Sequence, residues 1–192
     1  MSYNESHYDF LNSFSNVPVE LVGDLLSITE LKTIAEGTHI VKLGEIPTKV
    51  YFLVSGVLRC FLMTESGKEF NKGFYLPLSF AGPLAALIQK KPSLFAFEAL
   101  TDIEVYEIDY YKLMDLCEKH ESINKLYAKV LETVYMSYEK RLVELISLNA
   151  TDRYLELKQQ LPDVDELIPQ YHIASYLGIT PVQLSRIRKK LE

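Results

Sequence analysis

The spacing of hydrophobic positions changes twice along the chain and divides it into three regions. Up to about residue 37 the pattern is helical, with apolar side chains at helical spacing in 19–26 and a second helical piece starting at 28–31. Between about 40 and 108 the period becomes two. From about Asp109 the helical period returns. This order predicts an α+β protein in which a sheet domain precedes a set of helices.

The central region consists of short runs rich in β-branched and aromatic residues. The run 103–108 alternates cleanly between apolar and polar residues and predicts a half-buried strand. Glycine and proline separate the runs, as at Gly44 and at 55–56. The other predicted strands are Ile40, 50–54, 57–62 and 97–100. Many short strands joined by turns favour a β-roll, a double-stranded, jelly-roll-like barrel.

A long helix is predicted from Glu121 to about Leu148. One face carries an apolar stripe with spacings of 4, 3, 4 and 3, typical of the seam between two coiled helices. The stripe consists of Leu131, Tyr135, Tyr138, Leu142 and Leu145. A second apolar face consists of Ile123, Leu126, Val130 and Val134. A helix that is apolar on two faces needs two partners, so we expect one face to pack on the barrel and the stripe to form a homodimer. Lining a ligand cavity is an alternative role for Tyr135 and Tyr138.

The region after this helix predicts further helices. Thr151 suits an N-cap, a helix follows over 153–161, and 162–166 has the composition of a linker. We therefore divide the chain into a β-roll domain at 1–120, a dimerisation helix at 121–148 and an all-α domain at 149–192.

The segment after the linker has the pattern of a helix-turn-helix. Gly178 suits the left-handed residue that ends a first helix. Thr180 and Pro181 suit the N-cap and first position of a second helix. The expected buried positions are Ile173, Leu177, Leu184, Ile187 and Leu191. An ordinary helical hairpin would explain this apolar spacing equally well, so charge has to separate the two interpretations.

Charge favours DNA binding. The chain has a net charge of −6, carried by residues 1–150, whereas 170–191 contains four basic residues and no acid. An acidic body with one basic tip suits a protein that touches DNA through a small face. The expected DNA-facing residues are Gln170, Tyr171, Thr180, Val182, Gln183, Ser185, Arg186, Arg188, Lys189 and Lys190. Of these, Gln170 and Tyr171 would meet a phosphate at a helix N-terminus. His172 would be a surface or phosphate-facing residue.

Other classes of function lack their residues. No apolar run is long enough to span a membrane, and 1–5 has no features of a signal peptide, so we expect a cytoplasmic protein. Cys60 and Cys117 cannot form a closed zinc or iron–sulfur site by themselves. The four histidines are scattered, and no phosphate loop or nucleophile elbow occurs. We expect no catalytic residue, metal or cofactor.

The whole order resembles the Crp/Fnr superfamily of bacterial regulators. The resemblance rests on Leu43-Gly44, Tyr51–Gly56, Glu104–Ile108 and Ala174–Lys190, and the C-terminal part looks most like the Bacteroidetes branch. It implies a cytoplasmic, dimeric regulator of transcription. The implied partners are an inverted-repeat operator in double-stranded DNA, RNA polymerase and an unidentified small-molecule effector. The family's wing hairpin is expected to be short or missing, because the second helix runs to Leu191.

The resemblance also assigns individual residues. The family's recognition helix often carries an Arg-Glu pair at its start and an Arg five residues after the first. Pro181 and Val182 stand at the first two places, and Arg186 stands at the third. Arg186 is therefore expected to read guanine, while Val182 would touch a thymine methyl group and Gln183 would read adenine.

The effector site departs from the family pattern. Relatives that bind cyclic AMP use Gly-Glu-Leu, followed about ten residues later by Arg-Ser or Arg-Thr. Here Pro83 replaces the Glu and Ser93 replaces the Arg. A buried cyclic phosphate without a cation is costly, so we expect no cyclic AMP binding of the usual kind. The expected effector pocket comprises Arg59, Gly82, Pro83, Leu84, Ser93 and Leu94.

Two alternatives stay open. One is a degenerate dimeric sensor module with little affinity for DNA. The other is an enzyme that binds a small molecule or a metal on the barrel.

Overall fold

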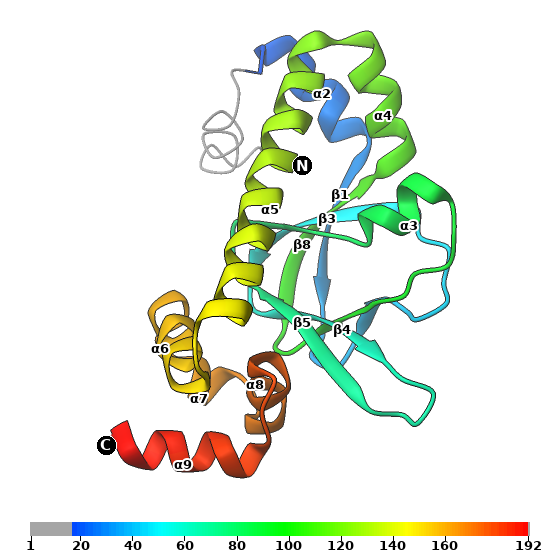
Figure 1. Ribbon diagram of the computed structural model, residues 1–192. Coiled ribbons are helices and arrows are strands. Elements are labelled where there is room, and N and C mark those ends of the chain that lie inside the picture. Colours follow the sequence, from blue (N-terminus) through cyan, green and yellow to red (C-terminus); the bar gives the residue numbers. More distant parts are fainter. Residues whose placement is uncertain (1–16, 192) are drawn as a thin grey trace.

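Two four-stranded antiparallel sheets lie face to face in the computed structural model, which describes residues 17–191 (Figure 1). One sheet has the order β1-β8-β3-β6 and the other β2-β7-β4-β5. The strands are β1 (Thr29–Ile34), β2 (His39–Val41), β3 (Lys49–Ser55), β4 (Leu58–Met63), β5 (Glu69–Tyr75), β6 (Ser79–Ala81), β7 (Ala96–Ala99) and β8 (Ile103–Asp109). The helices are α2 (Val19–Ser27), α3 (Leu84–Gln89), α4 (Tyr110–Lys119), α5 (Glu121–Ser147), α6 (Ala150–Gln160), α7 (Val164–Leu167), α8 (Gln170–Leu177) and α9 (Pro181–Leu191). The predicted α+β order is confirmed.

Alternating side chains from both sheets form the first core cluster. In β3, Tyr51 and Leu53 point inward, and Phe97 of β7 meets them from the opposite sheet. Gly56 makes the close turn between β3 and β4 possible. Its φ is +81°, and a Cβ there would lie 2.3 Å from the carbonyl oxygen of Asp102. Only glycine fits this turn without displacing the backbone.

The predicted second helical piece at 28–31 is wrong, because β1 begins at Thr29. A window of four residues fits helical spacing by chance. These residues form a strand because β8 offers backbone hydrogen-bond partners to six consecutive residues, from Thr29 opposite Ile108 to Ile34 opposite Ile103. The part of the helical prediction before Val17 lies outside the described residues.

Besides β1, two strands, β5 and β6, were absent from the sequence prediction. β5 has the sequence Glu-Phe-Asn-Lys-Gly-Phe-Tyr, whose polar centre hides the strand pattern. Its register on β4 shifts between Gly73, opposite Cys60, and Asn71, opposite Phe61. Lys72 is the extra residue and forms a β-bulge. Bulges redirect side chains, and this one brings Lys72 into the wall of an apolar cavity.

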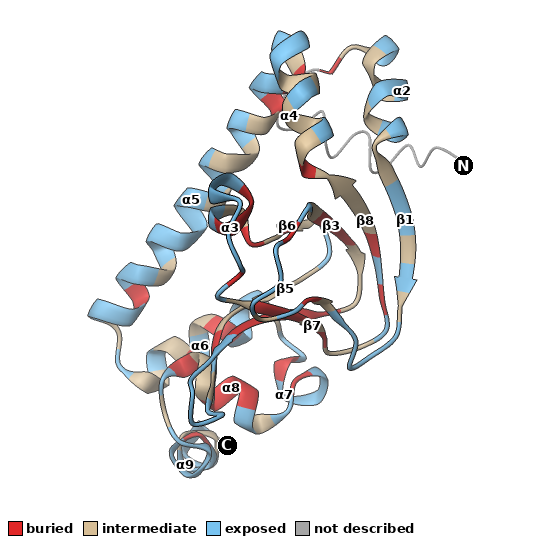
Figure 2. Ribbon diagram, turned by 90° about the vertical axis from the view of Figure 1, so that its right-hand side faces the viewer, coloured by how far each residue is buried: buried red, intermediate tan, exposed pale blue. Residues whose placement is uncertain are grey.

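Helix α5 runs along one side of the sandwich from the α2–α4 end to the C-terminal helices (Figure 1). It covers 27 residues, close to the predicted extent. Ile123 and Leu126 are its buried apolar residues, whereas much of its length is exposed or half-buried (Figure 2). No helix in the described part of the chain combines the length and apolar character that crossing a membrane requires.

The C-terminal helices differ in two details from the prediction. Asn149, not Thr151, caps α6, because its side-chain oxygen accepts hydrogen bonds from the backbone N–H groups of Thr151 and Asp152. The predicted linker 162–166 is mostly helical, since α7 begins at Val164. Val164 is fully buried and anchors this short helix in the second core cluster.

Candidate DNA-binding surface and effector cavity

The helix-turn-helix is formed by α8 and α9. Gly178 ends α8 with a φ of +70°, in the predicted left-handed conformation. Thr180 caps α9, because its hydroxyl accepts a hydrogen bond from the backbone N–H of Gln183 at 3.2 Å. The Gln183 side-chain oxygen accepts one in return from the Thr180 N–H at 2.9 Å. These reciprocal bonds are a capping box and fix the direction in which α9 leaves the turn.

The buried side of α9 matches the prediction except at its end. Leu184 is fully buried together with Ile173 and Leu177, and Ile187 packs against them. Leu191 is 46% exposed, so its predicted burial is wrong. Leu191 lies in the last turn of α9 and lines an open surface pocket with Tyr154 and Leu155 of α6, so it is only partly covered.

The opposite side of α9 presents a cationic stripe to solvent. Val182, Ser185, Arg186 and Lys189 are exposed and follow each other at helical spacing, so they share one face. Lys190 is exposed next to them. Within residues 17–191, Arg186, Lys189 and Lys190 form no ion pair. We call these five residues the α9 stripe.

Besides Thr180, three candidate DNA contacts are engaged within the protein. The Gln170 side chain donates to the Pro181 carbonyl oxygen at 2.8 Å, and Gln183 is held in the capping box. Arg188 pairs with Asp165. Reading adenine would require Gln183 to leave the capping box, whereas Gln170 could still meet a phosphate through its backbone N–H, and Arg188 would attract DNA less strongly beside Asp165. Tyr171 is 59% exposed, with its ring against His172.

A buried polar network joins α8 to the sheet domain. The Arg59 guanidinium, 5% exposed, bonds Glu69 at 2.6 Å and pairs with Glu98. It also lies 3.0 Å from His172 Nδ1, and Asn71 donates to the His172 carbonyl oxygen at 3.1 Å. On the same side, the Ser175 hydroxyl donates to the Glu69 carbonyl oxygen and accepts from the Asn71 N–H. We call these six residues the α8–β5 network.

The network overturns two predictions. Arg59 does not belong to an effector pocket, since its donors are occupied by Glu69, Glu98 and His172. His172 does not face solvent or a phosphate, because it is 4% exposed. Burial, assisted by the charge of Arg59, lowers the pKa of His172 to about 4. The ring is therefore neutral at pH 7 and accepts a hydrogen bond at Nδ1 from Arg59.

No local sequence pattern indicated this network. His172 is 113 residues from Arg59 and 101 from Asn71 along the chain. A polar residue inside a strand run, such as Asn71, is the one available signal, and it is shared by many solvent-facing positions. The second core cluster also joins the sheet domain to α8, since Val57 of the sheet domain is buried with Ile173 and Leu177 of α8.

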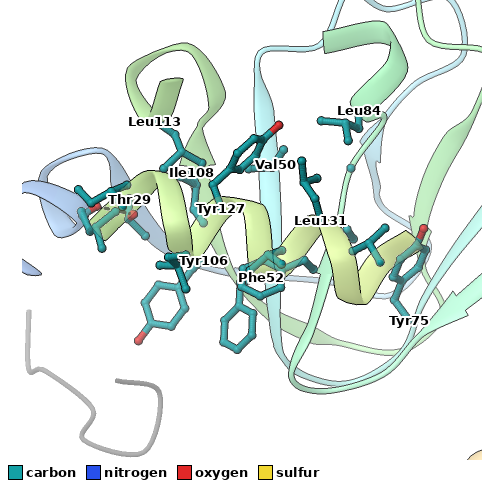
Figure 3. A pocket seen from close by; sticks show the side chains of 18 of the residues that line it. Thr29, Val50, Phe52, Tyr75, Leu84, Tyr106, Ile108, Leu113, Tyr127 and Leu131 are labelled. Carbon is teal, nitrogen blue, oxygen red and sulfur yellow. Dashed lines mark hydrogen bonds between the residues drawn. The ribbon is translucent and has the colours of Figure 1, made fainter. Parts of the chain in front are cut away.

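A large apolar cavity lies between α5, α2 and the β1-β8-β3-β6 sheet. Its volume is about 570 Å³. In Figure 3, Thr29 and Tyr75 lie at opposite ends of the labelled lining side chains, with Phe52, Val50 and Tyr127 between them. The α5 side chains Ile123, Leu126, Val130, Leu131, Val134 and Tyr138 also line it. Among the predicted pocket residues, Gly82 and Leu84 line this cavity.

The other predicted pocket residues lie elsewhere. Pro83 is at the N-terminus of α3, and Leu94 is 76% exposed. Ser93 is buried, and its hydroxyl donates to the Phe95 carbonyl oxygen at 2.7 Å and accepts from the Phe95 N–H. Ser93 therefore braces its own loop and directs no donor toward a ligand phosphate.

The predicted dimer stripe is exposed on the single chain. Tyr135 is 66% exposed, Leu142 57% and Leu145 46%. Tyr138 is 43% exposed and, with Leu131, also lines the cavity, so both roles weighed for it from the sequence meet at this residue. Exposed leucines in a row mark a surface that a partner would cover.

Comparison with known proteins gives relatives of one kind. The family described as cyclic nucleotide-binding domain matches residues 31–120. The anaerobic regulatory protein of Haemophilus influenzae is 25% identical over 171 residues, covering 83% of this chain and 66% of that protein. The protein of the same name from Pasteurella multocida is 24% identical over 176 residues, covering 86% and 64%. The chain thus spans just under two thirds of the length of these relatives.

Solved structures share the fold. The c-di-GMP responsive global regulator CLP of Xanthomonas campestris superposes with a TM-score of 0.70 at 17% identity, covering 91% of each chain. FixK2 of Bradyrhizobium japonicum gives 0.69 at 21% identity, covering 85% of this chain and 84% of its own. The likeness to the Bacteroidetes branch stays a prediction. Residues 31–120 therefore form a domain of the cyclic nucleotide-binding type, and the β-roll, the long helix and the helix-turn-helix together have the fold of these solved regulators.

Proposed function

We propose that this protein is a dimeric, sequence-specific DNA-binding regulator that reads an inverted-repeat operator with α9. The α9 stripe carries the proposal: an acid-free face at helical spacing on the second helix of a helix-turn-helix, in a chain whose net charge is −6. Such a face suits the major groove, where Arg186 would bond guanine and Lys189 and Lys190 would attract phosphates.

The dimer follows from α5. Two copies that pair through the exposed stripe Leu131–Leu145 would present two α9 helices. For one recognition helix in each of two successive major grooves, the helices must lie about 34 Å apart. The operator is then an inverted repeat, with a centre that matches the two-fold axis.

Selection from random duplexes tests this proposal. The full chain is incubated with a duplex library, and bound sequences are recovered at more than one salt concentration, because phosphate contacts alone give salt-dependent, sequence-independent binding. We expect an enriched inverted repeat. If the library is retained without an enriched sequence, the protein binds phosphates only. If nothing is retained, it is a dimeric sensor module without useful DNA affinity. Both outcomes contradict the proposal.

A further inference from the structure

The effector cavity has one charged residue in its wall. The lining residues within 17–191 are mostly aliphatic and aromatic, with hydroxyl groups from Thr29 and four tyrosines. Among these lining residues, Lys72 supplies the one ammonium group. None of the lining residues within 17–191 carries a carboxylate. A cavity of about 570 Å³ lies in the range that encloses small molecules, which are held mainly by apolar contact and oriented by a few polar groups.

The β-bulge brings Lys72 to this wall. Its neighbour Asn71 belongs to the α8–β5 network, and the extra residue at the bulge lets the next side chain leave that face. The ammonium nitrogen lies 4.4 Å from the Phe95 ring centroid and 4.7 Å from that of Tyr138. Within the described residues it forms no ion pair. An aromatic face stabilises a cation less than an anionic partner would. Lys72 therefore makes this end of the cavity suited to a negatively charged group of a ligand.

Two hydroxyl groups lie at the same end. Tyr75 and Tyr138 both line the cavity, and their oxygens are 3.4 Å apart. Burial raises the pKa of Tyr75 well above its ordinary value, so it stays a neutral hydrogen-bond donor. An anionic head would therefore meet one cation and phenolic donors, while the rest of the cavity offers only apolar contact and a few hydroxyls to a tail.

We propose that the cavity binds a small lipophilic anion, with its acidic group at Lys72 and its hydrocarbon body along α5. This assignment rests on the proposed role of the domain as a sensor and names the chemical class of its effector. The lining excludes a polar sugar phosphate, because ribose hydroxyls would lose water against leucine and valine side chains without gaining partners. A hydrocarbon body instead gains free energy from the same surface.

The ligand would touch two elements that contact α8. β5 carries Lys72 next to Asn71 of the α8–β5 network. α5 carries Tyr138 one turn before Arg141, whose guanidinium lies 3.8 Å from the Tyr176 ring centroid in α8 and donates to the Tyr176 carbonyl oxygen. Occupancy should therefore change operator affinity, and operator should change ligand affinity by the same factor.

Calorimetry with sodium octanoate and octan-1-ol tests the ligand class, because the two probes share a tail and differ in charge. We expect octanoate to bind the full chain about tenfold more tightly, as charge-assisted hydrogen bonds contribute at least this much. Lys72→Met keeps the length of the side chain and should abolish the difference. Lys68→Met is the matched control: Lys68 lies 4.8 Å from the Phe70 ring centroid but is exposed and does not line the cavity.

Several outcomes would overturn the proposal. Equal affinity for the two probes, or a preference that survives Lys72→Met, removes the role of the cation. Binding of neither probe means that the cavity does not take a lipophilic anion. If cyclic AMP binds more tightly than octanoate and this binding is lost in Lys72→Met, the lysine binds a phosphate group instead. Lys72→Gln repeats the test if Lys72→Met does not fold by circular dichroism. No DNA is present, so the result is independent of the operator selection.

Discussion

Arg186 and Lys189 share one face of α9 but should contribute to binding in different ways. Arg186→Ala removes the planar donor pair that fits guanine, so affinity for the selected operator should fall by roughly 1–3 kcal/mol and preference at one position per half-site should relax. Lys189→Ala removes a phosphate contact, so all sequences should weaken alike and the salt slope should decrease by about 1. Titration of both variants on operator and mutated duplexes separates the roles. An unchanged preference in Arg186→Ala would show that α9 does not read bases.

The two residues that depart from the family's cyclic AMP-binding pattern, Pro83 and Ser93, lead to a second prediction. Ser93 is buried and bonded to Phe95, and Pro83 starts α3, so neither offers the donor that a cyclic phosphate needs. We expect cyclic AMP and cyclic GMP to bind weakly or not at all in calorimetry. A dissociation constant below about 1 µM, corresponding to some 8 kcal/mol of binding free energy, would mean that another group replaces the missing arginine.

Residues differ in how far their sequence surroundings reveal them. Gly178 and Thr180 were predictable because their roles depend on rules that act within one turn of chain: left-handed backbone, N-capping and helical spacing. Arg59, Asn71 and His172 were not, because their function arises from a contact between segments about 100 residues apart. A buried arginine and an exposed one have the same local pattern, so Arg59 was misassigned to the effector pocket and Lys72 was not singled out.

At the scale of elements, the strongest signals are again those that are complete within one element. β8 alternates on its own, and α5 shows its helical period over 27 residues. β1 and β5 were missed because one depends on the edge of β8 and the other is interrupted by a bulge. An edge strand takes its conformation from its partner's hydrogen bonds, which no window of sequence contains.

Helix α5 should dimerise through its exposed stripe. Leu142→Glu places a carboxylate in the middle of the expected seam, where desolvation of an unpaired charge is costly, so the dimer should dissociate. Met136→Glu is the matched control: Met136 is 58% exposed against 57% for Leu142, but about 120° around the helix at 100° per residue. Light scattering should give twice the 22.1 kDa chain mass for the unaltered protein and Met136→Glu, and one chain mass for Leu142→Glu. A monomeric unaltered protein at micromolar concentration would contradict this interpretation.

At the scale of the whole molecule, the α8–β5 network should make stability depend on pH. His172 has a pKa of about 4 in the folded protein and about 6.5 when exposed. The folded state therefore binds fewer protons in this interval. Its stability should be complete above pH 6.5 and decrease as the pH falls from 6.5 to 4, by up to about 3 kcal/mol.

Thermal unfolding across this pH range measures the effect. His172→Gln keeps a hydrogen-bonding side chain that does not take up a proton, so its unfolding temperature should fall less between pH 7 and 4.5 than that of the unaltered protein. His39→Gln, at an exposed histidine, should leave the pH dependence as it was. Parallel curves for all three proteins would show that His172 protonation is not linked to folding.

The second core cluster also bears on how such proteins can be recombined. Val57 is a full member of it, and Phe74, Leu76 and Leu100 of the sheet domain pack against its helical residues. The C-terminal helices therefore share their interior with the β-roll and do not constitute an exchangeable cassette. A chimera that receives residues 149–192 from another protein inherits the helical part of that interior but not the sheet-domain side chains that complete it. Matching side chains at Val57 and Phe74 would be needed to complete it, so the operator specificity proposed for this protein should be redesigned on the surface of α9 and not by exchange of the whole C-terminal part.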